Sequence, residues 1–128
     1  MTKNEKEMLL QDICSRLPHG IVVATTDNDG TIPNYWMLDQ YNRLTEDVRL
    51  TNFDVDADRL TDFCDIRPYL FPLSSMTAEQ KTSHNFLKHS AYANPVKLID
   101  WYIKNNFDYR GLIPMGLAID ATGLGIYL

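Results

Sequence analysis

Two strings of unusual composition constrain the fold of this chain more than any other feature. Residues 67–77 read Arg-Pro-Tyr-Leu-Phe-Pro-Leu-Ser-Ser-Met-Thr, and residues 107–113 read Phe-Asp-Tyr-Arg-Gly-Leu-Ile. The two strings enclose a pair of predicted helices. Neither string contains a nucleophile beside a base, a cluster of metal ligands or a phosphate-binding loop. We therefore interpret them as determinants of packing and turn geometry.

Capping signals define the two enclosed helices. Thr77 followed by Gln80 forms a capping box, which predicts a helix that runs to about His89. Asn94 and Pro95 are typical of an N-cap and a first helical position, and they predict a second helix that extends to Asn105. Its apolar face is expected along Val96, Ile99 and Ile103, widened by Leu98, Trp101 and Tyr102.

The first part of the chain predicts another helix and a small sheet. Leu9, Leu10, Ile13 and Leu17 recur at helical spacing, with Asp12 on the polar side, and Pro18 ends this helix. Residues 21–26 form a β-branched run that a turn at 27–30 closes. Residues 48–55 alternate as a strand with a bulge near Asn52. Residues 31–47 show no clean period.

The last strand prediction comes from the first of the two strings. Pro68 and Pro72 bracket residues 69–71, and proline cannot donate to a sheet ladder, so this segment is expected to be an edge strand or an extended connector. Residues 122–128 are expected to be loosely held. The whole pattern predicts one α+β domain over residues 1–128, with an N-terminal helix, a small antiparallel sheet or partly open barrel, and two C-terminal helices.

Composition places the protein among ordinary soluble domains. Hydrophobic residues make up 45% of the 128 residues and charged residues 23%, and no apolar run approaches the length of a membrane span. The mixed charges at the start do not resemble a secretion signal, so a cytoplasmic location is expected. Cys14 and Cys64 lie outside any paired motif, and we expect them to be thiols that act as small buried hydrophobes.

Charge is concentrated in the middle of the chain. Residues 27–65 hold ten acids and three bases, a local net charge of −7 within a total of −5. Such a segment repels phosphate backbones, which argues against direct nucleic-acid binding and is compatible with a basic protein partner. A solvated surface is the simpler interpretation.

The sharpest metal-like pattern lies in this acidic segment. Asp54, Asp56 and Asp58 match the first three ligand positions of a calcium loop. Arg59 occupies the position where glycine makes the turn, and Asp65 is shorter than the glutamate usual at the last position. We therefore favour a solvated acidic loop, expect no metal, and keep the three aspartates as candidate binding residues.

No catalytic residue or cofactor can be assigned from the other reactive side chains. His84 and His89 are five positions apart and do not share a helical face, so a zinc pair is not expected. Cysteine–histidine catalysis would require Cys14 or Cys64 beside a histidine, which the spacing neither requires nor forbids. No nucleophile elbow or dinucleotide fingerprint is present.

The aromatic residues divide into core and candidate surface. Most are expected in the core, whereas Tyr35 and Trp36 lie in the poorly patterned region and are candidates for an exposed binding pair. Arg110, which follows Tyr109, is expected to make a structural ion pair or to stack on an aromatic ring.

The strings also carry a resemblance. Residues 7–20, 67–77 and 107–118 resemble a numerous family of short proteins of unassigned activity, found in prophages and mobile elements of gut anaerobic bacteria. The likeness fades between residues 26 and 65. It transfers no activity, cofactor or site residue, but it implies the context of a small cytoplasmic accessory protein.

These observations favour a non-enzymatic interaction module over two alternatives. One alternative is a small hydrolase or metal-assisted enzyme whose site is scattered along the sequence, and the other is a structural, oligomeric phage component. A shallow aromatic and acidic patch would favour the interaction module, whereas a deep pocket with converging titratable groups would favour the enzyme.

Overall fold

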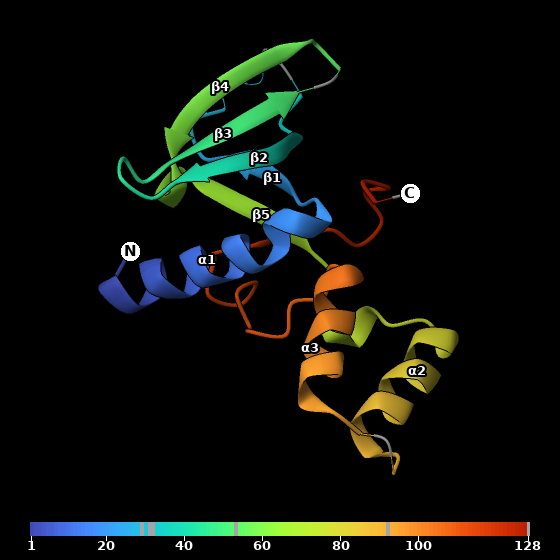
Figure 1. The fold of residues 1–128 in the computed structure, drawn as a ribbon. Coiled ribbons are helices and arrows are strands. Elements are labelled where there is room, and N and C mark those ends of the chain that lie inside the picture. Colours follow the sequence, from blue (N-terminus) through green and yellow to red (C-terminus); the bar gives the residue numbers. More distant parts are fainter. Residues whose placement is uncertain (29, 31–32, 53, 92, 128) are drawn as a thin grey trace.

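An open sheet of six strands lies over the N-terminal helix, and two shorter helices extend away from both (Figure 1). The computed structural model describes residues 1–28, 30, 33–52, 54–91 and 93–127. The strand order is β4-β3-β2-β1-β5-β6, antiparallel except for the β5–β6 pair. The predicted α+β class is confirmed, with an open sheet. The elements are α1 (Lys3–Arg16), α2 (Ala78–His89) and α3 (Pro95–Lys104), the strands β1 (Val22–Thr25), β2 (Trp36–Asn42), β3 (Asp47–Asn52), β4 (Ala57–Asp62), β5 (Ile66–Leu70) and β6 (Ile119–Asp120), and the 3₁₀ turns η1 (Leu17–His19), η2 (Phe63–Asp65) and η3 (Leu73–Ser75).

Helix α1 begins at a capping box and ends before a proline, as local chemistry requires. The N–H of Glu5 donates to the Thr2 hydroxyl, and the Thr2 N–H donates back to the Glu5 carboxylate, each at 3.1 Å. Leu9 and Ile13 are fully buried, as the helical spacing predicts. Asp12 is also fully buried, so its predicted place on the polar side is wrong. The buried Asp12 carboxylate has partners that include a residue from another segment of the chain, and helical spacing alone cannot predict such a contact.

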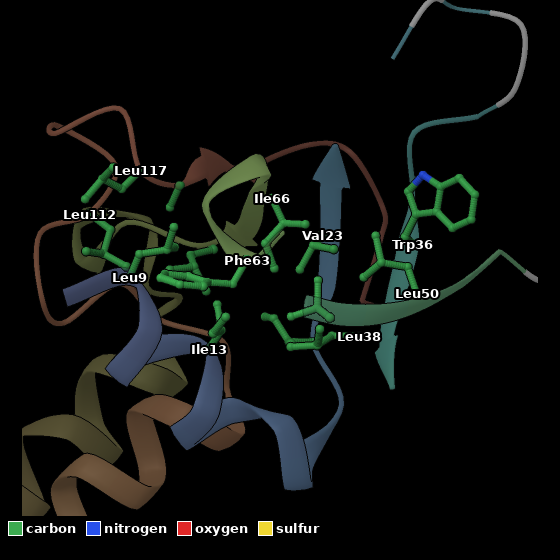
Figure 2. Close-up of a cluster of buried hydrophobic side chains, with 14 residues drawn as sticks. Leu9, Ile13, Val23, Trp36, Leu38, Leu50, Phe63, Ile66, Leu112 and Leu117 are labelled. Atoms are coloured by element: carbon green, nitrogen blue, oxygen red, sulfur yellow. The ribbon is translucent and has the colours of Figure 1, made fainter. Parts of the chain in front are cut away.

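The main core lies between α1 and the sheet (Figure 2). Leu9 and Ile13 of α1 face Val23, Leu38 and other apolar side chains of the strands. Leu112 and Leu117, which follow α3, close the same core from the side. Burying a large aliphatic side chain contributes about 1.5–3 kcal/mol to folding, so this cluster fixes α1 on one face of the sheet.

Two details of the predicted sheet need correction. β3 pairs with β4 without a register shift from Asp47 to Asn52, and the bulge lies in β2, between Leu38 and Gln40. Val55, predicted to be part of the strand, is 43% exposed in the β3–β4 turn. Phe53 lies outside the described residues. The bulge in β2 shifts its side-chain alternation, which explains why residues 31–47 showed no clean period.

The extended segment predicted around the prolines is β5. Pro68 lies opposite Val23 of β1. On the other side, β6 pairs with β5 only at Tyr69 and Leu70. The prediction of an edge strand at residues 69–71 is therefore wrong for Tyr69 and Leu70, because β5 lies between β1 and β6. Only the half of β5 that contains Pro68 has a neighbour on one side alone, as is typical of a strand that contains proline.

The two strings are hydrogen-bonded to each other near the point where α2 and α3 extend away from the sheet. The Phe71 N–H donates to the Asn106 carbonyl at 2.8 Å, and the Asp108 N–H donates to the Phe71 carbonyl at 2.8 Å. The rings of Phe71 and Phe107 meet edge to face, with centroids 6.3 Å apart. Both strings therefore determine packing, as their composition indicated.

Helices α2 and α3 form a projecting unit that we call the arm, residues 78–89 and 95–104 (Figure 1). Both predicted caps are confirmed: Thr77 and Gln80 exchange hydrogen bonds, and Asn94 accepts from two N–H groups. The predicted apolar face of α3 is covered only in its last turns. Val96 is 67% exposed and Ile99 41%, whereas Ile103 is buried. No helix of the described residues is long and apolar enough to cross a membrane.

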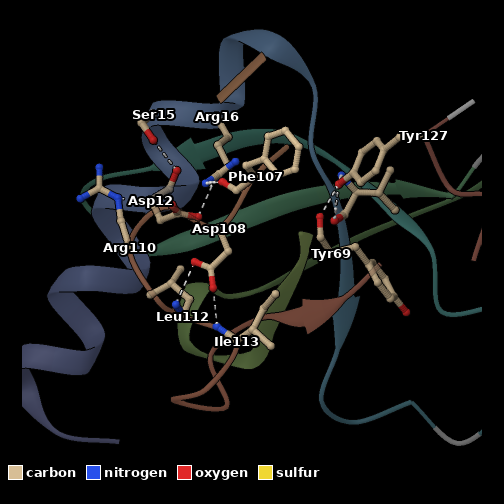
Figure 3. Close-up of polar contacts among 11 residues, drawn as sticks. Asp12, Ser15, Arg16, Tyr69, Phe107, Asp108, Arg110, Leu112, Ile113 and Tyr127 are labelled. Atoms are coloured by element: carbon tan, nitrogen blue, oxygen red, sulfur yellow. Dashed lines mark hydrogen bonds and ion pairs between the residues drawn. The ribbon is translucent and has the colours of Figure 1, made fainter. Parts of the chain in front are cut away.

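The C-terminal residues cross the sheet face opposite α1, and the prediction that they are loosely held is wrong for Tyr127. Its hydroxyl donates to the Tyr69 carbonyl at 2.8 Å and accepts from the Val22 N–H at 3.0 Å (Figure 3). Burial raises the pKa of this phenol. The tail thus covers a second apolar cluster formed around Ala24, Tyr69 and Ala121.

Candidate protein-binding surface

A cluster of charged side chains joins α1 to the second string (Figure 3). Arg16 donates through Nε to Asp12 at 2.9 Å and through Nη2 to the Phe107 carbonyl at 2.6 Å. Arg110 lies 3.3 Å from the other oxygen of Asp12. Burial raises the pKa of Asp12, while Arg16 and Arg110 oppose that shift.

Other side chains of the second string also make contacts within the protein. The carboxylate of Asp108 accepts from the N–H groups of Leu112 and Ile113, each at 2.8 Å. The guanidinium of Arg110 lies 5.0 Å from the Tyr109 ring centroid. Arg110 therefore makes both predicted contacts, the ion pair and the ring contact. The cluster holds α1 to the chain beyond α3, and its charged groups contact one another or nearby backbone groups.

A separate pocket of about 270 Å³ opens on the sheet face opposite α1. Its floor is apolar, and it includes Val22 of β1 and Met37 of β2, which are paired across the two strands. Tyr35 and Asp54, two of the five candidate binding residues, lie at this pocket. The remaining lining residues belong to the C-terminal tail: Leu124, Gly125 and Ile126.

Tyr35 is positioned by the residue before it and by a ring beneath it. Asn34 accepts from the Thr25 N–H at 2.8 Å and donates to the Thr25 carbonyl at 3.0 Å, which ties the segment before β2 to β1. The ring of Tyr35 lies 5.3 Å from that of Tyr69, and the side chain remains 42% exposed. Tyr35 therefore offers an aromatic surface with little freedom to move.

Asn52, which the sequence reasoning missed as a site residue, brings the two sides of the pocket together. Its side chain is buried, accepts from the Asp54 N–H at 3.1 Å and donates to the Pro33 carbonyl at 2.9 Å. One amide thus fastens the β3–β4 turn to the segment that carries Tyr35. A lone asparagine at the end of a strand gives no sequence signal for such a role.

The other two aspartates of the calcium-like spacing do not join Asp54 at the pocket. Asp56 is exposed in the β3–β4 turn, with a positive φ of 49°. Asp58 is on β4, where its carboxylate accepts from Arg49 at 3.2 Å. Among the described residues, no group of three or more acids, histidines or cysteines is arranged to hold a metal ion.

The predicted exposure of Trp36 is wrong. Its side chain is 3% exposed and belongs to the main core, on the same face of β2 as Leu38. The guanidinium of Arg59 lies 5.9 Å from the ring centroid, and two hydrogen bonds to Asp27 hold Arg59 there. These bonds also lower the pKa of Asp27. Tyr35, immediately before β2, is exposed at the pocket, so Tyr35 and Trp36 do not form one exposed pair.

The two cysteines differ in exposure, and one histidine contacts a tyrosine. Both cysteines were predicted to be buried, but Cys64 is only half-buried against the main core and Cys14 is exposed. Cys14 lies on α1 next to the buried Ile13. His84 contacts the Tyr102 hydroxyl at 2.6 Å and has a pKa lowered by burial.

Comparisons with known proteins do not indicate a function for this chain. No protein-family model matches the chain, and no curated protein or solved structure is significantly similar to it.

Proposed function

We propose that the protein is a non-enzymatic interaction module whose pocket at Tyr35 and Asp54 binds a lysine or arginine side chain of a basic protein partner. The observation that supports this function is the combination of an apolar floor, an exposed aromatic ring and a carboxylate in one pocket. Long basic side chains have this amphipathic character, with an apolar stem and a cationic end.

The size of the pocket favours a single side chain. Sites for drug-sized ligands usually enclose about 300–1,000 Å³, whereas a cavity of about 150 Å³ accepts benzene. A volume of about 270 Å³ lies between these cases. The methylene stem would contact Met37 and Ile126, and the cationic group would approach the ring of Tyr35 and the carboxylate of Asp54.

The charge distribution supports the same partner. The segment that contains β2, β3 and β4 carries the local charge of −7, which attracts a basic surface over a distance set by the salt concentration. The resemblance to mobile-element proteins is consistent with an accessory that acts by binding. Affinity is therefore expected to fall as salt is added.

A fluorescence anisotropy titration with a labelled oligolysine peptide tests this proposal. The wild-type protein should bind the peptide more weakly at high salt, and Asp54→Asn or Tyr35→Ser should each reduce affinity about tenfold, equivalent to about 1.4 kcal/mol. Asp100→Asn is the matched control, because it removes the same charge from an exposed position on α3. It should bind nearly as well as the wild type.

Two results would contradict the proposal. One is equal affinity for all four proteins, which would mean that the pocket takes no part in binding. The other is equal binding of an oligoglutamate peptide, which would exclude recognition of basic charge. Circular dichroism spectra of both pocket variants should match the wild type, because Tyr35 and Asp54 are both exposed.

A further inference from the structure

We propose that the basic partner is a second copy of this chain, whose arm docks on the pocket at Tyr35 and Asp54. This inference rests on the proposed function and identifies its partner. It arises from two surface patches of this chain that are complementary in charge and similar in apolar character.

The first patch is on the arm. Phe86 of α2 is 56% exposed and lines a groove with Trp101 of α3. No residue of α2 is buried. Between the helices lies an apolar groove of about 460 Å³, lined by Phe86, Trp101 and neighbouring residues. Four lysines and two acids give the arm a net charge of +2: Lys81, Lys88, Lys97 and Lys104 against Glu79 and Asp100.

The second patch surrounds the pocket. Tyr35 and Leu124 are 42% and 48% exposed, and Asp54 provides an acidic group beside them, within the acidic segment of residues 27–65. Each patch thus has an apolar part and charged groups of a single dominant sign, and the two signs are opposite. Protein interfaces commonly combine an apolar centre with a polar rim of this kind.

The fold prevents the two patches of one molecule from meeting. The arm extends from one end of the molecule, and the β3–β4 hairpin lies at the other end of the sheet (Figure 1). The contact must therefore join the arm of one copy to the pocket of another. Because the two surfaces differ, each copy keeps one free patch, and the contact can repeat into open chains or close into a ring.

Sedimentation velocity over a range of protein concentrations tests this contact. The wild type should form dimers and larger species, and these should dissociate when 1 M salt reduces the Debye length to about 3 Å. Phe86→Ser should disable the arm and Tyr35→Ser the pocket, so that each variant alone is monomeric. Leu44→Ser is the control, because Leu44 is 95% exposed outside both patches, and it should associate like the wild type.

Mixing the two disabled variants gives the decisive result. The Phe86→Ser protein keeps its pocket and the Tyr35→Ser protein keeps its arm, so an equimolar mixture should form dimers that grow no further. A wild type that stays monomeric at every concentration, or variants that associate as strongly as the wild type, would overturn the inference. If oligolysine still binds the monomeric protein, the proposed function stands without self-association.

Discussion

Asp12 and Arg16 occupy the same side of one helical turn, and both are fully buried. Removing two charges from water costs several kcal/mol for each ion, and the fold offsets that cost with specific partners. Arg16 reaches the Phe107 carbonyl, and Asp12 is within ion-pair distance of Arg110. The Asp12 and Arg16 pair therefore connects α1 to the segment after α3. Loss of either side chain would leave the other buried without its opposite charge.

Asp12→Asn should destabilise the protein by about 3–5 kcal/mol, because it leaves the buried guanidinium of Arg16 without its counter-charge. Urea unfolding followed by circular dichroism measures the change. Asp100→Asn, at an exposed position, should change stability by less than about 0.5 kcal/mol. A similar small effect for both variants would show that the buried pair contributes little.

Single residues also mark the limit of sequence reasoning about the site. Tyr35 and Asp54 could be selected because an exposed aromatic ring and an acidic turn have compositional signals. Asn52, which joins their two segments, could not, because its hydrogen bonds connect backbone groups that are distant in sequence. Trp36 was misplaced because the start of β2 was not recognised, so the alternation that buries it was unknown.

At the level of elements, helices were predicted more accurately than strands. The capping residues Thr77 and Asn94 act within a few residues of themselves, so their effect can be read locally. β2 was missed because its bulge interrupts alternation. β4 was missed because it is an edge strand whose residues are all exposed or half-buried, and it lacks an apolar period.

The arm should lose stability when the pH falls. Burial lowers the pKa of His84 below its ordinary value of 6.5, and Lys88 and His89 lower it further. The unfolded chain therefore takes up a proton at this residue more readily than the folded one, so stability decreases as the pH falls through the range below 6.5. Amide hydrogen exchange of α2 between about pH 8 and pH 5 should reveal this loss, after correction for intrinsic exchange rates.

His84→Gln should reduce that pH dependence, and His89→Gln, at an exposed position, is the matched control. The protection factors of α2 in His84→Gln should vary less with pH than those of the wild type. An unchanged pH dependence in His84→Gln would exclude His84 as its source.

At the level of the whole molecule, the sheet is covered on different faces by segments from opposite ends of the chain. α1 covers one face through the main core, and the C-terminal tail covers part of the other (Figures 1 and 2). The predicted fold class was correct because the helices and two of the strands have clear patterns. The tail was predicted to be loose because residues near a chain terminus are usually poorly ordered, whereas Tyr127 bonds to groups far away in sequence.

Tyr127→Phe should destabilise the protein by about 1–3 kcal/mol, because the Val22 N–H and the Tyr69 carbonyl lose their partner in a partly buried site. Thermal unfolding monitored by circular dichroism measures the effect. Tyr35→Phe is a control with the same chemical change on an exposed ring, and its melting temperature should stay close to that of the wild type. Equal melting temperatures for all three proteins would mean that the tail adds nothing to stability.

The absence of any buried residue in α2 has an evolutionary consequence. Most substitutions on this helix leave the interior intact, so its outward-facing residues can diverge at little cost in folding, whereas α1 is constrained by the Asp12 and Arg16 pair. A lineage that carries this protein could therefore alter the surface of α2 while it inherits the sheet unchanged.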